Sequence, residues 1–441
     1  MAHILHRSAG SSRSTYSAFP GRLRRFEVMH VQAHDDEVVV RAARLWDGRA
    51  RRPVTGTDVR LRGAHVVELG TDLSPSPGGQ SVDLPGHTLL PGLIDCHVHV
   101  VDEALDTEPL AYQALSAGPV LRTLLMHGFT TVRDLGGADQ PVNTSLKRAV
   151  DEGHLLGPRL IVAPNMLSAR GGHGDKTPHL AERYQLAVGN LADGPAAVIR
   201  AVREQARCGA DWIKVAVSGG FSSPTDRPID VGYTQEELDV MVQAAADRGL
   251  PVAAHAFGDE AVRRALQAGV RSIEHGCLAS AGTLRLIAEA GAFLVPTQYA
   301  QRYFLDRLED DGFWRGRPTG MRTAFRAYAC ALRSGFALPA TCGAIVAFGT
   351  DAGMYPHAEN WREFPTLVSN GFSPQQALSA ATAHAAALLQ RPDLGHIAPG
   401  GVSDIVAVPG DPFEDISVLG RVSFVMQHGR VIREPGEAPR T

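Results

Sequence analysis

The sequence predicts an α/β protein: a (β/α)8 TIM barrel with a small β-sandwich domain built from both chain ends. Short apolar runs alternate with helix-like stretches through the middle of the chain, a pattern typical of parallel strands joined by helices. Strand and turn patterns without helices occupy the two flanks. The 441 residues, 44% of them hydrophobic, are enough for a barrel and one smaller domain.

The first residues follow neither pattern. Residues 1–30 carry scattered Arg, Ser and Gly without apolar periodicity, so we expect a disordered tail and no secretory signal. Residues 31–90 and 396–441 read as strands and turns and are expected to form the β-sandwich. The remaining residues, 91–395, are then expected to form the barrel.

Eight apolar runs are predicted as barrel strands, with helices between most of them. Thr234 and Glu237 form a capping-box pattern that starts one helix, predicted to end near Arg248. Ser373 and Pro374 start another, predicted to continue to Gln390. The predicted strands are residues 91–100, 130–134, 160–164, 212–217, 251–255, 272–275, 293–296 and 345–349.

Charge and cysteine content exclude several classes of protein. The formal net charge is −4, and no basic cluster lies beyond the tail, which argues against nucleic-acid or membrane-surface partners. No apolar run reaches transmembrane length. Five cysteines without CxxC spacing fit reduced thiols in a cytoplasmic protein. We therefore expect a cytoplasmic protein whose partner is a small molecule, and we expect a homo-oligomer.

The first predicted strand carries a pair of histidines, His97 and His99. Alternate residues of a strand point to one face, so the two imidazoles are expected side by side, as in a metal site. Such a pair also arises by chance in strands. Whether it belongs to a metal site therefore depends on the residues of the other predicted strands.

Metal-capable side chains recur at or near the ends of other predicted strands. Strand four carries Lys214, strand five ends in His255, strand six ends in His275, and Asp351 follows strand eight. Taken singly, each histidine could be a hydrogen-bonded core residue and the aspartate a turn residue. Together with the first pair they fall at one end of one barrel, where such barrels place their chemistry.

Lys214 is the most informative of these residues. The chain has only three lysines, Lys147, Lys176 and Lys214, and the last lies between Ile213 and Val215 in an apolar run. A buried ammonium is costly unless it is paired or neutralised. Carbamylation by CO2 would convert it into a carboxylate-like group able to bridge two cations. The alternatives are a lysine that reaches the barrel mouth or pairs with a carboxylate.

The chain resembles the amidohydrolase superfamily over roughly residues 36–435. The segment 397–406 is similar to that family's return to its β-sandwich. The run 213–220, IKVAVSGG, is similar to the imidazolonepropionase-related, Xaa-Pro dipeptidase-like branch. The resemblance implies two divalent cations, with zinc expected, held by His97, His99 and Asp351 for the more buried ion, by His255 and His275 for the second, and by a carbamylated Lys214 that bridges both.

The resemblance also implies an activity. The chain is expected to be a metal-dependent amidohydrolase of carbon–nitrogen bonds, a dipeptidase or N-acyl-amino-acid hydrolase that uses a metal-bridging hydroxide. Asp351 is the expected proton shuttle, and Lys214 is the second residue expected in the catalytic centre.

Two other functions are alternatives to this one. A deaminase or cyclic-amide hydrolase with one metal is disfavoured because such relatives lack the bridging lysine, and deaminases tend to have Glu where Gly258 lies. A scaffold without activity is disfavoured because all six ligand positions are filled. Two departures from the family pattern are Phe257, where relatives often carry a polar ring, and the sequence Pro399-Gly400-Gly401 at the sandwich return.

Substrate contacts are expected from the loops that follow the strands. His173 and Arg170 lie in a glycine-rich loop after strand three and offer donors to a substrate carboxylate. Tyr233 and Tyr299 follow strands four and seven. In the alternative interpretation, His173 and Arg170 pair with Asp175 or Glu182 and only hold the loop.

Overall fold

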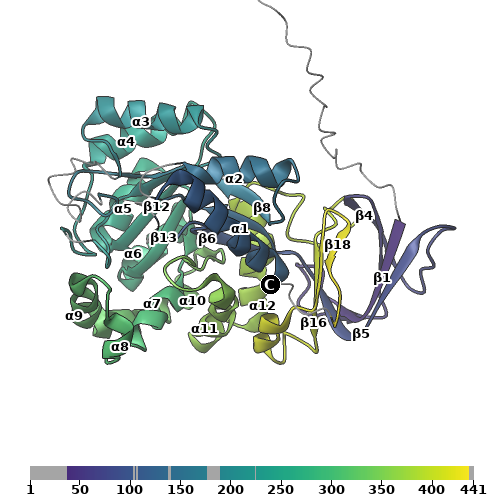
Figure 1. Ribbon diagram of the computed structural model, residues 1–441. Coiled ribbons are helices and arrows are strands. Elements are labelled where there is room, and N and C mark those ends of the chain that lie inside the picture. Colours follow the sequence, from purple (N-terminus) through teal and green to yellow (C-terminus); the bar gives the residue numbers. More distant parts are fainter. Residues whose placement is uncertain are drawn as a thin grey trace, which may run out of the picture. The chain divides into compact units, whose positions relative to one another are not determined.

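The computed structural model describes residues 37–102, 105, 108–137, 141–175, 189–223 and 225–436 (Figure 1). All of these belong to one compact unit, residues 33–441. The predicted tail, residues 1–30, lies outside the described residues.

An eight-stranded mixed sheet combines the two ends of the described chain. Its order is β18-β17-β16-β5-β1-β3-β4, with β2 paired to β1. The central strand β5 runs parallel to β1 and antiparallel to β16. The bounds are β1 Glu37–Leu45, β2 Val54–Thr55, β3 Asp58–Arg62, β4 His65–Gly70, β5 Gln80–Pro91, β16 Ile405–Pro409, β17 Phe424–Gln427 and β18 Arg430–Arg433. Both flanks thus contribute to one sheet; a separate domain with the predicted bounds stays a prediction.

Strand β5 was not among the strands that the sequence predicted. Pro85 and Gly86 interrupt its apolar pattern, and Gly86 has a positive φ of 74°. The ladder with β1 shifts register between Ala42 and Arg44, which accommodates this interruption. Leu89 and Leu90 beyond it are fully buried, so packing overrides the local turn signal.

The middle of the chain forms two parallel sheets. One has the order β6-β7-β8 and the other β10-β9-β11-β12-β13-β14-β15, and every pair in both is parallel. The bounds are β6 Leu93–Val98, β7 Phe129–Asp134, β8 Arg159–Val162, β9 Met166–Ser168, β10 Asn190–Leu191, β11 Ile213–Ala216, β12 Val252–Gly258, β13 Ser272–Leu278, β14 Phe293–Val295 and β15 Ile345–Val346.

Backbone hydrogen bonds join these two sheets on both sides. The amide of Cys96 in β6 donates to the carbonyl of Phe348 just after β15, at 2.8 Å. The amide of Asp211, before β11, donates to the carbonyl of Val162 in β8, at 2.9 Å. The eight predicted strands all coincide with parallel strands of this α/β fold. The third continues past Pro164 as the separate strand β9, which pairs with β11.

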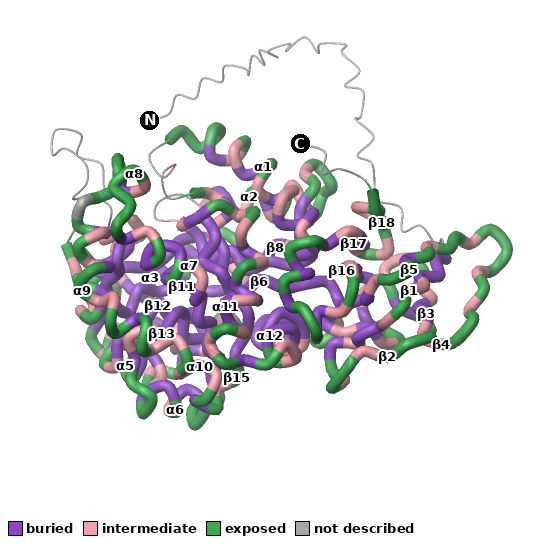
Figure 2. The backbone as a smooth tube through the Cα atoms, turned by 90° about the horizontal axis from the view of Figure 1, so that it is seen from below, coloured by how far each residue is buried: buried purple, intermediate pink, exposed green. Residues whose placement is uncertain are grey.

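Six helices follow the strands: α1 Leu110–Met126, α2 Val142–Asp151, α3 Pro195–Arg207, α4 Gln235–Ala246, α5 Asp259–Ala268 and α6 Ala281–Glu289. The capping box of Thr234 and Glu237 starts α4 as predicted. Four more lie between β14 and β15: α7 Gln298–Leu305, α8 Asp311–Trp314, α9 Thr319–Gly335 and α10 Leu338–Thr341. Figure 2 shows the strands of the parallel sheets buried beneath the outer helices.

The predicted single helix from Pro374 to Gln390 is divided. It begins at the expected capping box as α12, Pro374–Ser379, passes through a π-helical turn at Ala380–His384, and ends as α13, Ala385–Leu388. The carbonyl of Ala380 accepts a hydrogen bond from the amide of Phe348, just after β15, at 2.9 Å, which joins the π-helical turn to the parallel sheet. The chain also forms a short helix, α11, from Glu363 to Ser369, before α12.

No helix in the described part of the chain combines the length and apolar character needed to cross a membrane. All five cysteines are free thiols, as the sequence predicted. The cytoplasmic location stays a prediction.

Candidate metal centre

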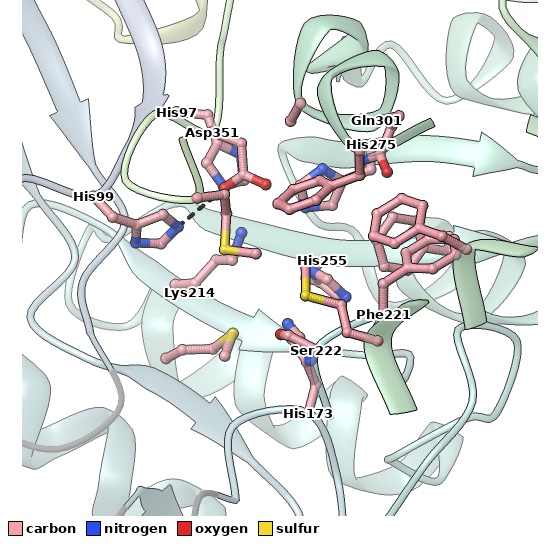
Figure 3. A pocket seen from close by; sticks show the side chains of 17 residues that line it. His97, His99, His173, Lys214, Phe221, Ser222, His255, His275, Gln301 and Asp351 are labelled. Atoms are coloured by element: carbon pink, nitrogen blue, oxygen red, sulfur yellow. Dashed lines mark ion pairs between the residues drawn. The ribbon is translucent and has the colours of Figure 1, made fainter. Parts of the chain in front are cut away.

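All six predicted ligands line one cavity, which holds about 560 Å³ of empty space including open solvent (Figure 3). They come from β6 and the residue after it, from β11, β12 and β13, and from the segment after β15. The lining side chains are His97, His99, Met166, His173, Lys214, Phe221, Ser222, His255, Phe257, His275, Ala300, Gln301, Phe304, Met321, Phe325, Asp351 and Met354.

Asp351 lies between the two histidines of the first strand. Its Oδ1 atom is 3.4 Å from Nε2 of His97 and 3.3 Å from Nε2 of His99. Candidate ligand atoms of His97, Asp351 and His275 all lie within 4.8 Å of one another. Three side chains from β6, β13 and the segment after β15 therefore form a compact donor set for one cation.

The four predicted histidine ligands form a continuous row of rings. Ring centroids are 5.5 Å apart for His99 and His97, and 4.9 Å apart for His97 and His275. The distance from His275 to His255 is 4.8 Å. The structure thus brings together imidazoles that are far apart in the sequence, as the strand-end pattern predicted.

In His97 and His99, the Nδ1 atom of the ring is held by a hydrogen bond within the protein. Nδ1 of His97 lies 2.8 Å from the carboxylate of Glu274. Nδ1 of His99 donates to the carbonyl of Gly136 at 2.6 Å. Each ring therefore presents Nε2 to the cavity, and the hydrogen bond fixes both its tautomer and its orientation.

In the second pair, His275 and His255 are also held by hydrogen bonds, but through different ring nitrogens. Nδ1 of His275 lies 2.7 Å from the hydroxyl of Thr297, which leaves Nε2 for a ligand. Nε2 of His255 donates to the carbonyl of Gly219 at 3.1 Å, which leaves Nδ1. Four ring nitrogens thus remain available as metal donors.

A buried ion pair supports His97 from behind. Glu274 also binds the guanidinium of Arg133 at 2.8 Å, and both side chains are fully buried. Burial acts to raise the pKa of Glu274, but the charge of Arg133 and the hydrogen bond from His97 outweigh it and hold that pKa at about 2. Arg133 is stacked over Trp212, 4.5 Å from the ring centroid. Glu274 is therefore an anionic acceptor for His97.

The electrostatics of the cavity favour neutral imidazoles at His255 and His275 next to an ionised carboxylate at Asp351. Burial, followed by the charge of Lys214, lowers the pKa of His255 to about 3. Burial likewise lowers the pKa of His275 well below its usual range. Burial acts to raise the pKa of Asp351, but hydrogen bonds and charges from the histidines overcome it and hold that pKa well below its usual range. At His99, burial acts to lower the pKa, but the hydrogen bond and charge of Asp351 outweigh it and raise that pKa to about 8. Neutral His255 and His275 and ionised Asp351 are the states that bind a divalent cation, and His99 has to release its proton to bind one.

Lys214 is 1% exposed, and its Nζ atom has no hydrogen-bond partner among the residues that the structure describes. Burial lowers its pKa from 10.5 to about 8. A buried amine without a partner is costly, and a lowered pKa makes the neutral, nucleophilic form accessible. The orphaned amine, the free imidazole nitrogens and the carboxylate fit a two-cation centre with a carbamylated bridge.

Strained backbone is concentrated here. His275 has φ 71°, Asp351 has φ 59° and Thr297 has φ 45°, all in the left-handed region. Left-handed backbone is costly for residues other than glycine, especially for a β-branched one. Such strain persists only where the surrounding structure holds it. Here it affects two candidate ligands, His275 and Asp351, and Thr297, which binds His275.

Of the predicted substrate contacts, only His173 lines the cavity. Its ring stacks on that of His255 with centroids 4.3 Å apart, and its Nδ1 lies 2.6 Å from the hydroxyl of Ser223. Asp175, two residues after His173, accepts the amide of Gly171 at 2.9 Å. This bond is not the pairing of Asp175 with His173 or Arg170 that the loop-holding alternative expects, so that alternative stays a prediction; Glu182 lies outside the described residues.

The other three predicted contacts lie elsewhere. The Arg170 side chain is 76% exposed and lies 3.5 Å from Asp193. Tyr233 is buried outside this lining, and the hydroxyl of Tyr299 donates to Glu359 at 2.5 Å. Their role as substrate contacts stays a prediction that the cavity lining does not support. Loop positions after a strand do not determine which side chain reaches inward, which is why the sequence could not separate them.

Several functional residues were missed in the sequence. Glu274 immediately precedes His275, and only the pairing of β13 with its neighbours turns its carboxylate towards His97. Thr297 follows a proline and carries no spacing signal. The aromatic residues Phe304 and Phe325 come from α7 and α9, whose packing no local pattern reveals.

Comparison with known proteins gives consistent matches. The model of the amidohydrolase family matches residues 88–432. Ochratoxinase of Aspergillus niger is 31% identical over 383 residues, covering 80% of this chain and 77% of the relative. Imidazolonepropionase of Anaeromyxobacter sp. (strain K) is 25% identical, covering 86% and 91%. The crystal structure of a Xaa-Pro dipeptidase with bound methionine in its active site superimposes with a TM-score of 0.83 at 34% identity, covering 90% of this chain and all of that one.

Proposed function

Because the chain belongs to the amidohydrolase family, we propose that it hydrolyses the amide bond of dipeptides or N-acyl amino acids at a centre of two divalent cations. The family resemblance seen in the sequence is confirmed, and so is a hydrolase that acts on amide or peptide bonds. The similarity to a Xaa-Pro dipeptidase and to ochratoxinase supports the proposed substrate class.

The two parallel sheets are proposed to form one closed (β/α)8 barrel, with the eight-stranded sheet as a small β domain beside it. The backbone hydrogen bonds from Cys96 to Phe348 and from Asp211 to Val162 support closure, because they bridge the sheets on both sides. The cavity then lies at the carboxyl ends of the strands, where barrel enzymes place their chemistry.

His97, His99 and Asp351 are proposed to hold the more buried cation, and His255 and His275 the second. When bound, the two cations, for which zinc is the expected metal, would lower the pKa of a shared water and polarise the substrate carbonyl. Lys214, as a carbamate, is the proposed shared ligand. Its orphaned amine in the cavity is the single observation that carries this proposal.

Asp351 is the proposed proton carrier. Its carboxylate is ionised in this environment and lies where it can accept a proton from the attacking water and return it to the leaving amine. The hydrogen bonds that hold His97 and His99 keep their Nε2 atoms towards this carboxylate, and the left-handed backbone of Asp351 fixes its direction.

His173 is the proposed anchor for the carboxylate of the leaving amino acid, because it lines the same cavity beside His255. His173→Ala is expected to lower kcat/KM on a carboxylate substrate by about tens to hundreds of times and to affect the matching C-terminal amide far less. Equal losses on both substrates would remove this role.

The function is tested by metal analysis and a substrate screen on one preparation. We expect about two ions per chain and hydrolysis of members of a dipeptide and N-acyl-amino-acid library. About one ion per chain, with turnover of cyclic amides or amino-heterocycles only, would favour the single-metal deaminase or cyclic-amide alternative. Full metal content without turnover of any amide would contradict the proposal.

A further inference from the structure

Four phenylalanine rings from four separate elements form one side of the cavity. Each ring is only 2–5% exposed, yet each contributes to the cavity lining. In Figure 3, Phe221 lies on the side of His255 and Gln301, away from His99. The cluster, called the aromatic wall, comprises Phe221 from the segment after β11, Phe257 of β12, Phe304 of α7 and Phe325 of α9.

The rings of the aromatic wall contact one another in series. Phe304 stacks on Phe325 with centroids 4.9 Å apart, and Phe325 stacks on Phe221 at 4.4 Å. Phe221 meets Phe257 edge-on at 5.1 Å. Stacked and edge-on pairs of this kind hold one another in place, so the wall is a pre-formed surface.

The wall reaches the candidate metal ligands. Phe257 stacks on His275 at 4.9 Å and meets His255 edge-on at 4.6 Å. A substrate group that lies on the wall is therefore within a short covalent reach of an amide carbonyl at the centre. The position held by Phe257 is also where this sequence departs from the polar ring expected in relatives.

Little polar surface is available elsewhere in the cavity. Apart from the six candidate ligands, the described lining offers only three polar side chains: His173, Ser222 and Gln301. The other lining residues are methionines, an alanine and the wall itself. Binding cavities of this composition obtain affinity from apolar contact and orientation from a few polar groups.

The same rings would also be explained as ordinary core packing. That explanation accounts for their burial but not for the cavity that all four line. Phe304 and Phe325 belong to helices inserted between β14 and β15, so this segment contributes directly to the surface that a substrate meets.

We propose that the aromatic wall binds an aromatic or bulky aliphatic group of the substrate, which makes the preferred substrates amides with such a group close to the scissile bond. The proposal rests on the amide hydrolysis proposed above. This group can belong to the acyl half of the substrate or to the leaving amino acid, because the wall offers the same apolar contact to both. The experiment below distinguishes the two positions.

The test compares three substrates. N-acetyl-L-alanine lacks a ring, N-(3-phenylpropanoyl)-L-alanine carries it on the acyl half, and N-acetyl-L-phenylalanine carries it on the leaving half. At least one ring substrate should exceed N-acetyl-L-alanine by about tenfold or more in kcat/KM. The better of the two ring substrates shows whether the wall binds the acyl half or the leaving amino acid.

Variants of the wall should remove this preference. Phe325→Leu, and Phe221→Leu as a second variant in case the first does not fold, should lower kcat/KM on the preferred ring substrate by about tenfold. Turnover of N-acetyl-L-alanine should fall clearly less than that of the ring substrate, and metal content should stay within about twofold. Phe413→Leu is the matched control, because Phe413 lies edge-on to Trp46, outside the cavity lining. Equal losses on all three substrates, or no loss, would overturn the proposal.

A binding measurement separates this proposal from the proposed function. Acetohydroxamic acid and 3-phenylpropanohydroxamic acid both chelate divalent cations, so their calorimetric Kd values on the metal-loaded chain do not depend on turnover. The phenyl probe should bind at least about tenfold tighter, and Phe325→Leu or Phe221→Leu should reduce that ratio several-fold. If no amide is hydrolysed but the phenyl probe binds tighter and the variants reduce that difference, amide hydrolysis is contradicted while the aromatic wall is supported as a binding surface. An unchanged ratio, or no binding of either probe, overturns the wall.

Discussion

The Nδ1 atom of His275 lies 2.7 Å from the hydroxyl of Thr297, and both residues have left-handed backbone. Thr297 is completely buried and directly precedes α7. The amides of Gln298 and Tyr299, the first two residues of that helix, donate to the carboxylate of Glu363 at 2.9 and 2.5 Å. Glu363 therefore fixes the turn that places the threonine hydroxyl against the imidazole.

Thr297→Val should weaken metal binding because it removes the hydroxyl that orients His275. Loss of an outer-shell hydrogen bond of this kind lowers metal affinity by about 10–100-fold. Competition with a chromophoric chelator measures the affinity, and the visible spectrum of the cobalt-substituted protein reports the geometry. Thr297→Ser, which keeps the hydroxyl, is the matched control. Equal metal affinity in the valine and serine variants would show that the hydroxyl does not position the ligand.

Lys214→Ala should remove most of the bound metal and activity, since the variant lacks the proposed bridging carbamate. Short carboxylic acids with bicarbonate should restore part of the activity. Metal analysis and kcat follow the effect, and 13C-labelled CO2 should give a carbamate signal in the wild type that the variant lacks. Lys147→Ala is the control, since Lys147 forms an ion pair with Asp211 at 2.6 Å and does not line the cavity. Full activity in Lys214→Ala would contradict the bridge.

Asp351→Asn should keep the fold and much of the metal but lose most of kcat, because an amide cannot accept the proton of the attacking water. The loss should be about 100-fold or more, in line with the contribution of a positioned general acid–base group. Circular dichroism and metal content check the folded state before kinetics are compared. A kcat within a few-fold of the wild type would remove Asp351 from proton transfer.

Glu37 should make folding stability depend on acidic pH. The amide of Ser76 and the guanidinium groups of Arg62 and Arg60 hold its pKa at about 2, below its ordinary value of 4.5. A group with a lowered pKa in the folded state stabilises it above the ordinary pKa, and this stabilisation is lost as pH falls from 4.5 towards 2.

Glu37→Gln should accordingly lower the thermal unfolding midpoint at pH 7, and the difference from the wild type should shrink between pH 4.5 and pH 2. The control is Asp83→Asn, since Asp83 is 64% exposed and pairs with Arg41 in the same sheet. A Tm difference that stays constant across this pH range would show that the charge of Glu37 does not contribute.

The sequence predicted which candidate ligands lie together, because the position of each depends on a local rule. His97, His255 and His275 end or nearly end apolar runs, and parallel strands bring such ends together. Thr234 starts α4 through the capping box that its own segment encodes. These features need no knowledge of distant contacts.

Other features depend on distant contacts and could not be predicted. Strand β5 forms across Pro85 and Gly86 because β1 pairs with both of its halves and β16 pairs with the second half. The contact of Glu274 with His97 spans two parallel sheets. The helix after Ser373 is divided by a π-helical turn at the residue, Ala380, whose carbonyl accepts the amide of Phe348 just after β15. In each case, a partner far along the chain outweighs the local signal.

The position of β5 also determines when the protein can complete its fold during synthesis. Residues His87–Pro91 pair with β16, and the amide of Gly92, just before the strand that carries His97, donates to the carbonyl of Asp404 at 2.8 Å. The ribosome makes these partners near the end of the chain, after every strand of both parallel sheets. Until then one edge of β5 lacks its partner, and unpaired edges are sites of misassembly in nascent chains. Strand β6 can pair with β7 early, but the bond that joins its start to the β5–β16 ladder forms only after Asp404 has been made.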